Sequence, residues 1–367
     1  MGRNLYVDLL RGYSIVAVFA VHGGIAPAFW SFMGNHLRSN FMQNGYYGVC
    51  IFFVISGYLI TATALRRWWT LGNIDLREFY ILRAARILPL LLLFSAAMAM
   101  LWALRIDGFV PKTPELFFGA IWSALTFQFN TYYQVSNVPG TVGLSQLWSL
   151  SIEEMFYIFF PLACVLLRQT RMAIIVVLIT LIAHAPAARL TTGFYTWFSC
   201  ADMLAMGCLT AILVANLPRS AIGTSAAGAS LVAGVVIIWG IFGWGSVHEN
   251  SMFGPTIVAF GAALVLFGAT YLPQVPSEGS WRRLRIVLWP QASFGRLSYE
   301  LYLFHIPALI LFRQFVGSPS EKPFLDVIFL AGLWAFAWII NRYVTENVNQ
   351  RIRRGFLAPA ELQALAA

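Results

Sequence analysis

Long apolar runs are the feature that most limits what this sequence can fold into. They recur along all 367 residues, and most are close to the roughly 20 residues of helix that cross a hydrocarbon core of about 30 Å. Apolar residues make up 59% of the chain and charged residues only 11%, whereas a soluble protein carries about 25% charged residues. A water-soluble fold could not cover this much apolar surface. The sequence therefore predicts an all-α polytopic integral membrane protein.

The number of crossings depends on one short segment. The apolar segments lie at 9–30, 47–65, 87–104, 116–129, 147–167, 172–188, 191–215, 225–244, 253–272, 295–316 and 324–343. Segment 116–129 has about 14 residues, which is short for a crossing. If it does not cross and the N-terminus is cytoplasmic, 18 Lys and Arg fall inside and 6 outside; if it crosses, 10 fall inside and 14 outside. Because Lys and Arg concentrate in cytoplasmic loops, we expect about ten transmembrane helices with both termini cytoplasmic, and a re-entrant or interfacial helix at 116–129.

No composition break divides the chain into folded domains. We expect a single transmembrane domain over 1–350 and a short cytoplasmic tail over 351–367. The formal net charge of +9 is explained by cytoplasmic loops, so nucleic acid is not an expected partner, whereas membrane lipids are. Ala26-Pro27-Ala28 loosely resembles a signal-peptide cleavage site, but charged residues inside the preceding apolar segment argue against cleavage.

The cysteines lie within apolar segments and form no C-x-x-C pair. We expect them to be small buried hydrophobic residues rather than disulfide partners or metal ligands, and no metal site is predicted. The four are Cys50, Cys164, Cys200 and Cys208.

Ionisable residues inside apolar segments are costly in a membrane and are therefore candidates for function. Arg11 and His22 stand eleven residues apart in the first segment. This spacing is three turns plus about 20°, so both would lie on one face of a helix, separated by about 16 Å along its axis. Arg11 would then be near the cytoplasmic face and His22 nearer the outside. The alternative is a structural histidine bonded to a neighbouring helix.

A second pair of ionisable residues, Glu153 and Glu154, stands in the segment that runs from outside to inside. Glu153 would lie at a depth similar to that of His22. A carboxylate at this depth could orient the histidine and stabilise its imidazolium form. The alternative is that Glu153 pairs with an arginine and that Glu154 faces a polar loop.

Further polar residues lie near the ends of other segments. Arg83 and Arg86 stand one helical turn apart and, with Arg11 and Arg77, could bind phosphates, although arginines are expected at a cytoplasmic end from topology alone. In the last part of the chain Arg296 and Glu300 have the spacing of a helical ion pair. His305 is either a helix-packing residue or a second base. Asp202 and His184 are also intramembrane, and no role is predicted for either.

Five blocks of the sequence together resemble the integral membrane acyltransferase family 3. They occur in the order VDLLRGYSIVAVFAVH (7–22), GVCIFFVISGYLI (48–60), FYILRAARILP (79–89), LWSLSIEEMFYIFFP (147–161) and LSYELYLFHIP (297–307). The family's Arg-x10-His motif corresponds to Arg11 and His22, and its Arg-x-x-Arg motif to Arg83 and Arg86. Its Trp-Ser-Leu and following Glu correspond to Trp148, Ser149, Leu150 and Glu153. Asp8 and His305 lie in the first and last blocks and are supporting candidates.

The resemblance implies transfer of an acyl group, most often acetyl, from acyl-CoA to a hydroxyl of a cell-surface glycan or lipid-linked saccharide. It implies His22 as the general base, acyl-CoA as the donor substrate with no tightly bound cofactor, and a place in a bacterial cytoplasmic (inner) membrane. Some members carry an additional soluble esterase-like domain, and none is expected here. A proton-coupled transporter or flippase that uses the same buried His and Glu is the alternative.

Overall fold

Every regular element in the described part of the chain is a helix. The computed structural model describes residues 4–23, 35–111, 113–136, 143–274, 281–318 and 323–357, and these ranges contain no strand. A helix satisfies its backbone N–H and C=O groups within one segment, which is what a chain without access to water requires. The predicted all-α class is confirmed.

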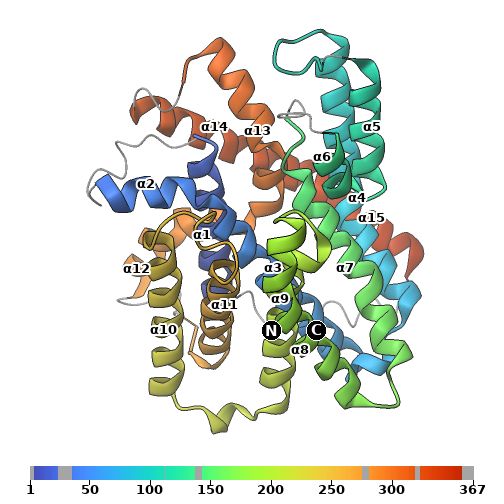
Figure 1. Cartoon of the computed structure of the whole chain (residues 1–367), viewed down its shortest axis with the longest axis vertical. Helices are drawn as coiled ribbons and strands as arrows, with labels where there is room; N and C mark the ends of the chain where they lie inside the picture. Colours follow the sequence, from blue (N-terminus) through green and yellow to red (C-terminus); the bar gives the residue numbers. More distant parts are fainter. Residues whose placement is uncertain are drawn as a thin grey trace. The chain divides into compact units, whose positions relative to one another are not determined.

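The helices form two compact units, each built from two separate stretches of sequence (Figure 1). The first unit, Met1–Leu71 with Leu167–Ser298, contains α1 (Leu5–Val21), α2 (Asn35–Gln43), α3 (Gly45–Trp68), α8 (Arg171–Thr192), α9 (Trp197–Asn216), α10 (Thr224–Gly243), α11 (Gly254–Tyr271) and α12 (Trp281–Arg296). The second, Gly72–Leu166 with Tyr299–Ala367, contains α4 (Leu76–Ala103), α5 (Pro114–Leu125), α6 (Phe129–Val135), α7 (Leu147–Leu166), α13 (Ser298–Phe315), α14 (Pro323–Ile340) and α15 (Glu346–Phe356). Because each unit draws on two stretches, no single linker in the sequence marks their boundary.

Eight helices in the described residues are long and apolar enough to cross a membrane. They are α3, α4, α7, α8, α9, α10, α11 and the continuous helix Phe324–Phe356, which joins α14 to α15 through a π-helical turn at Asn341–Thr345. The predicted segments 9–30 and 295–316 are not among them, so the count of about ten is not confirmed. The chain is an integral membrane protein, and the predicted tail from residue 351 begins inside α15.

Helix α1 is shorter than the apolar segment that predicts it. It has 17 residues and ends at Val21, because Gly23 adopts a left-handed backbone conformation with φ of 71°, which commonly terminates a helix. The Ala26-Pro27-Ala28 triplet lies outside the described residues.

Helix α5 covers most of the segment predicted not to cross. It has 12 residues, and Pro114 occupies its first turn. At 1.5 Å per residue it is about 18 Å long, which is less than the thickness of a hydrocarbon core. Phe127 has a positive φ of 57° and separates α5 from the short helix α6. Helix α5 is therefore too short to cross by itself, and its re-entrant or interfacial placement stays a prediction.

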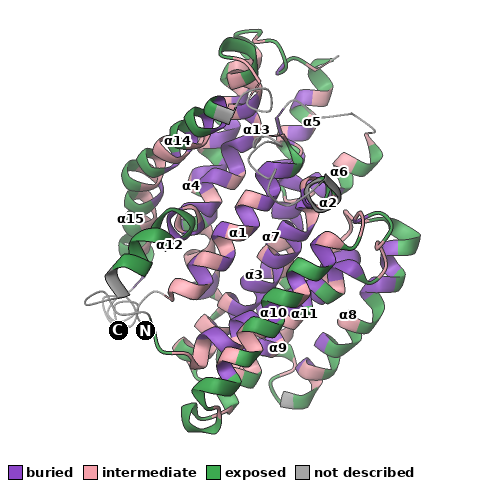
Figure 2. Ribbon diagram, turned by 90° about the vertical axis from the view of Figure 1, so that its left-hand side faces the viewer, coloured by how far each residue is buried: buried purple, intermediate pink, exposed green. Residues whose placement is uncertain are grey.

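Exposed apolar side chains cover long stretches of several helices. In Figure 2 α10 and α14 are largely green, whereas α3 is mostly purple. Val232 and Val236 on α10 are 59% and 63% exposed, and Ile328 on α14 is 52% exposed. Apolar exposure on this scale is unusual for a soluble protein but matches surfaces that meet lipid tails.

Two glycines let α3 and α9 pack with their backbones close together in the first unit. A methyl group added to Gly207 would lie 2.1 Å from the carbonyl oxygen of Val54, and one added to Gly57 would lie 2.1 Å from that of Leu204. Small residues at such contacts are the usual basis of membrane helix association, where lipid tails remove most of the hydrophobic driving force.

We predict that Gly207→Ala lowers the thermal stability of the protein in detergent, by about 1–3 kcal/mol, because the added methyl group must push two backbones apart. Gly240→Ala on α10 is the matched control, since nothing lies within 4 Å of its added methyl group. Because Ala has a higher helix propensity than Gly, the melting temperature of Gly240→Ala should be equal to that of wild type or slightly higher. Equal melting temperatures for wild type and Gly207→Ala would contradict the close α3–α9 packing.

Candidate functional site

In the first unit α1 carries the predicted residues Asp8, Arg11 and His22. The side chain of Asn4 caps this helix by accepting hydrogen bonds from the backbone N–H of Tyr6 (3.0 Å) and Val7 (3.4 Å). Asp8 is buried, Arg11 is half-buried, and His22 is exposed at the C-terminal cap. The helix thus presents His22 at its carbonyl end, where Gly23 terminates it.

In the second unit α4 places Arg83 and Arg86 in different surroundings. The Arg83 guanidinium lies 4.8 Å from the centroid of the Tyr157 ring on α7 and 5.6 Å from that of the Phe79 ring. Arg86 is exposed. A guanidinium between two aromatic faces is held by cation–π attraction. The structure therefore separates two arginines that the sequence treats as an equivalent pair.

Tyr157 also links Arg83 to Glu153. The Tyr157 hydroxyl donates a hydrogen bond to the Glu153 carboxylate one helical turn earlier on α7. Glu154 is only 5% exposed, and the alternative in which it faces a polar loop stays a prediction. Residues 153 and 154 are 100° apart around the helix, and this rotation directs Glu154 into the packed interior.

The start of α7 is joined to α13 by hydroxyl and amide groups. The Ser149 and Tyr302 hydroxyls lie 2.6 Å apart, and the Tyr302 hydroxyl donates to the carbonyl oxygen of Gln146 at 3.2 Å. The Gln146 side chain donates to the Leu303 carbonyl oxygen at 2.7 Å. Trp148, the residue before Ser149 in the sequence, is buried. Ser149 is therefore a link between helices.

His305 lies one turn further along α13 and is buried, with 2% exposure. Its Nδ1 is 2.6 Å from the carbonyl oxygen of Tyr302. A carbonyl oxygen only accepts, so Nδ1 carries the hydrogen, and in the neutral ring the basic nitrogen is Nε2. This geometry suits either of the two roles considered for His305.

The predicted helical pairing of Arg296 with Glu300 stays a prediction. Helix α12 ends at Arg296 and α13 begins at Ser298, so Leu297 interrupts the helix between the two residues. Glu300 accepts a hydrogen bond from the Asn341 side chain at 2.8 Å, and the Arg296 guanidinium lies 5.9 Å from the centroid of the Trp289 ring.

The predicted site residues therefore fall into two groups. The first unit holds Asp8, Arg11 and His22; the second holds Arg83, Arg86, Trp148, Ser149, Glu153 and His305. Within the second unit, Tyr157 brings Glu153 and Arg83 together. The pairing of His22 with Glu153 stays a prediction from their depths in the sequence.

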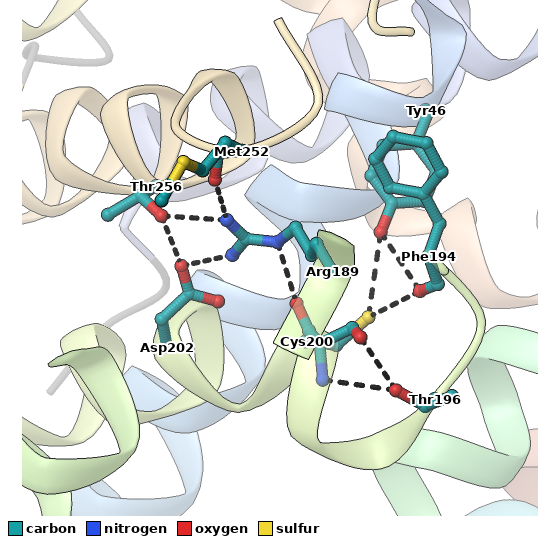
Figure 3. A network of polar contacts seen from close by, with 9 residues as sticks. Tyr46, Arg189, Phe194, Thr196, Cys200, Asp202, Met252 and Thr256 are labelled. Carbon is teal, nitrogen blue, oxygen red and sulfur yellow. Dashed lines mark hydrogen bonds and ion pairs between the residues drawn. The ribbon is translucent and has the colours of Figure 1, made fainter. Parts of the chain in front are cut away.

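The first unit contains a buried ion pair that was not predicted from the sequence. Arg189 on α8 pairs with Asp202 on α9, and both side chains are fully buried (Figure 3). Thr256 on α11 donates to the same Asp202 oxygen. Arg189 is one of the six Lys and Arg predicted to lie outside, and no role is predicted for Asp202. Opposite charges near the joined ends of two successive apolar segments were the available signal, because such helices run antiparallel and bring these positions together.

The described residues contain no group of three or more His, Cys, Asp or Glu side chains that could hold a metal ion. Cys50, Cys164, Cys200 and Cys208 are all buried free thiols, which agrees with their prediction as small apolar residues.

A family model described as an acyltransferase domain, the acyltransferase 3 model, matches residues 4–342. The chain belongs to the acyltransferase 3 family. The match includes both units and every predicted site residue.

Two relatives of this acyltransferase 3 chain have names that describe an activity. The chain is 27% identical over 343 residues to YrhL of Bacillus subtilis (strain 168), provisionally named a peptidoglycan O-acetyltransferase; the alignment covers 85% of this chain and 50% of YrhL. It is 24% identical over 378 residues to O-acetyltransferase OatA of Staphylococcus aureus (strain NCTC 8325 / PS 47), covering 97% of this chain and 58% of OatA. The chain thus spans about half the length of these relatives. No solved structure matches it.

We predict that Asp202→Ala destabilises the protein by about 3–5 kcal/mol, because it leaves the Arg189 guanidinium buried without its counter-charge. Thermal unfolding in detergent measures the effect. The double variant Arg189→Met with Asp202→Leu should recover much of the loss, since it removes both buried charges and retains apolar volume. A melting temperature in Asp202→Ala equal to that of wild type would contradict a buried ion pair.

Proposed function

We propose that this protein is a membrane O-acyltransferase that moves an acyl group, most often acetyl, from acyl-CoA to a hydroxyl of a cell-surface glycan or lipid-linked saccharide. The observation that carries the proposal is the acyltransferase 3 match over residues 4–342, which includes Arg11 and His22 on α1. The name of YrhL, which specifies peptidoglycan, favours a cell-wall glycan as the acceptor class. The protein would lie in a bacterial cytoplasmic membrane with both termini in the cytoplasm.

His22 is the proposed general base. It takes the proton of the acceptor hydroxyl while that oxygen forms a bond to the thioester carbonyl carbon. The C–S bond then breaks, and the coenzyme A thiolate leaves and takes up a proton, which the imidazolium can return. Two features of the position of His22 support its role as the base. His22 is exposed, so a substrate can reach it, and the carbonyl end of a helix favours positive charge on a nearby imidazolium.

Arg86 is the proposed contact for the donor phosphates. A guanidinium matches phosphate geometry and stays charged, and Arg86 is exposed.

Arg83 is proposed to act differently, because its guanidinium already lies against Tyr157 and Phe79. It would hold Tyr157 and, through that hydroxyl, the carboxylate of Glu153. Glu153 remains the predicted orienter of His22.

The proposal is tested by incubating purified protein with labelled acetyl-CoA and soluble glycan strands. Wild type should acetylate the strands, or slowly hydrolyse the thioester when no acceptor is present, and a transporter should do neither. We expect His22→Ala to lower the transfer rate by about 10²-fold or more, which is the usual contribution of a general base. His184→Ala, another exposed histidine in the same unit, should retain activity. Transfer at the wild-type rate by folded His22→Ala would exclude His22 as the base.

We predict that Arg86→Ala raises the KM for acetyl-CoA roughly tenfold, because a charge-assisted hydrogen bond contributes about 1.5–3 kcal/mol, and that it leaves the acceptor KM unchanged. Arg168→Ala is the control, since Arg168 is also exposed and also predicted to be cytoplasmic. Arg83→Ala should lower kcat and thermal stability more than it changes the donor KM. An unaltered donor KM in Arg86→Ala would remove Arg86 from the donor site.

A further inference from the structure

Two loops lie side by side at one end of the first unit. The buried Arg189 guanidinium donates hydrogen bonds to the backbone beside one loop and within the other. One is the 193–196 loop between α8 and α9, and the other is the 244–253 loop between α10 and α11. The Arg189 Nε donates to the Ser199 carbonyl oxygen (2.8 Å), just after the first loop. Its Nη1 donates to the Met252 carbonyl oxygen (2.6 Å), within the second (Figure 3). The guanidinium of a fully buried ion pair thus links the first turn of α9 to the 244–253 loop.

A second buried side chain fixes the 244–253 loop. Asn44, at the start of α3, is fully buried. Its amide nitrogen donates to the carbonyl oxygens of Phe242 (3.0 Å) and Gly245 (2.7 Å), and its oxygen accepts from the Val247 N–H at 2.7 Å. Three hydrogen bonds from one buried amide restrict the loop backbone, so that the loop surface is largely pre-formed.

The surface of these fixed loops is aromatic. The Phe194 ring lies 5.0 Å from that of Tyr46 and 5.8 Å, edge to face, from that of His248. His248 is exposed, and Trp244 on the same loop is 76% exposed. We call Phe194, Trp244 and His248 the loop platform. Exposed rings such as those of Trp244 and His248, carried on a rigid backbone, offer contact area at little entropic cost.

Hydroxyl and acidic groups lie on the same loops and on the adjoining helix ends. The Thr192 and Thr196 hydroxyls lie 3.0 Å apart, and the Thr196 and Ser199 hydroxyls 2.6 Å apart. Glu249 is exposed, and one of its oxygens accepts from the Ser246 N–H at 2.8 Å. Neither loop contains Lys or Arg. Arginines occur instead at the opposite helix ends, at the end of α3, around the start of α8 and after α9: Arg66, Arg67, Arg168, Arg171 and Arg219. The positive-inside rule therefore assigns the loop platform to the outer face.

We propose that the loop platform binds the glycan acceptor of the acyl transfer, which rests on the proposed function. The apolar C–H face of a sugar ring packs on the faces of aromatic side chains, while its hydroxyl and amide groups find partners such as Glu249 and Thr192 at the polar tips. The platform faces the side from which a cell-surface glycan arrives. The buried pair of Arg189 and Asp202 acts as its support, which gives these two intramembrane charges a function beyond stability.

Exposed aromatic rings at a membrane surface can also serve as a bilayer anchor. The loop platform fits that role less well, because Glu249 would face anionic headgroups and because an anchor does not require its loops to be fixed by two buried side chains. The experiment must nevertheless separate the two roles.

The test uses the full chain in nanodiscs, titrated calorimetrically with soluble glycan strands of alternating N-acetylglucosamine and N-acetylmuramic acid. An aromatic contact of the usual strength corresponds to about a fivefold change in affinity. We expect Trp244→Ala and His248→Ala each to raise the glycan Kd and the glycan KM by about that factor. The KM for acetyl-CoA should not change.

Two controls match these substitutions. His184→Ala removes an exposed histidine that also contacts a phenylalanine edge to face, at 6.2 Å from Phe198. Trp122→Ala removes a tryptophan that is 70% exposed on α5. Both should bind the strands as wild type does.

Unchanged glycan affinity in both platform variants would overturn the inference. So would a loss of nanodisc-specific thermal stability without a change in glycan affinity, which would identify an anchor. Failure of the proposed function has a different signature, because wild type would then bind strands but transfer no acetyl group from acetyl-CoA.

Discussion

The lack of water in the hydrocarbon core governs this structure. A backbone amide or carbonyl left unpaired there costs several kcal/mol, so every regular element in the described residues is a helix. The same condition weakens hydrophobic attraction between helices, because lipid tails are as apolar as Leu. Close packing through small residues, such as Gly57 and Gly207 between α3 and α9, then becomes a principal source of association. Polar contacts also contribute to helix association where charged side chains are buried.

Several charged groups find their partners on neighbouring residues. Arg189 uses Asp202, Thr256 and two backbone carbonyls. Arg83 uses the faces of two aromatic rings, and Glu153 uses the hydroxyl of Tyr157. An intramembrane charge is usually considered a functional candidate. Here the charges divide into those that hold helices in place and those, such as Arg86 and His22, that stay exposed.

This division matters for the chemistry. An acyl transfer between a cytoplasmic thioester and an outer acceptor needs exposed groups at both ends and fixed groups between them. Helix α1 spaces Arg11 and His22 about 16 Å apart, and the fixed loops of the first unit offer an acceptor surface on the side assigned to the outside. The fully buried Arg189–Asp202 pair connects stability to recognition, because the same guanidinium pairs with the acid and links the first turn of α9 to the 244–253 loop.

Apolar runs and motif spacing are local properties, so the sequence was enough to predict the helical class, eight of the membrane helices and the candidate residues. It did not determine the end of α1 at Val21, where Gly23 overrides a longer apolar run. Nor did it distinguish Arg83 from Arg86, because their difference depends on what packs against each face of the helix. The sequence offered a signal for the pairing of Arg189 with Asp202, in the opposite charges at the joined ends of two successive segments, but none for the contact between the 193–196 and 244–253 loops. That contact depends on how α8 and α9 pack beside α10 and α11, which no local pattern encodes.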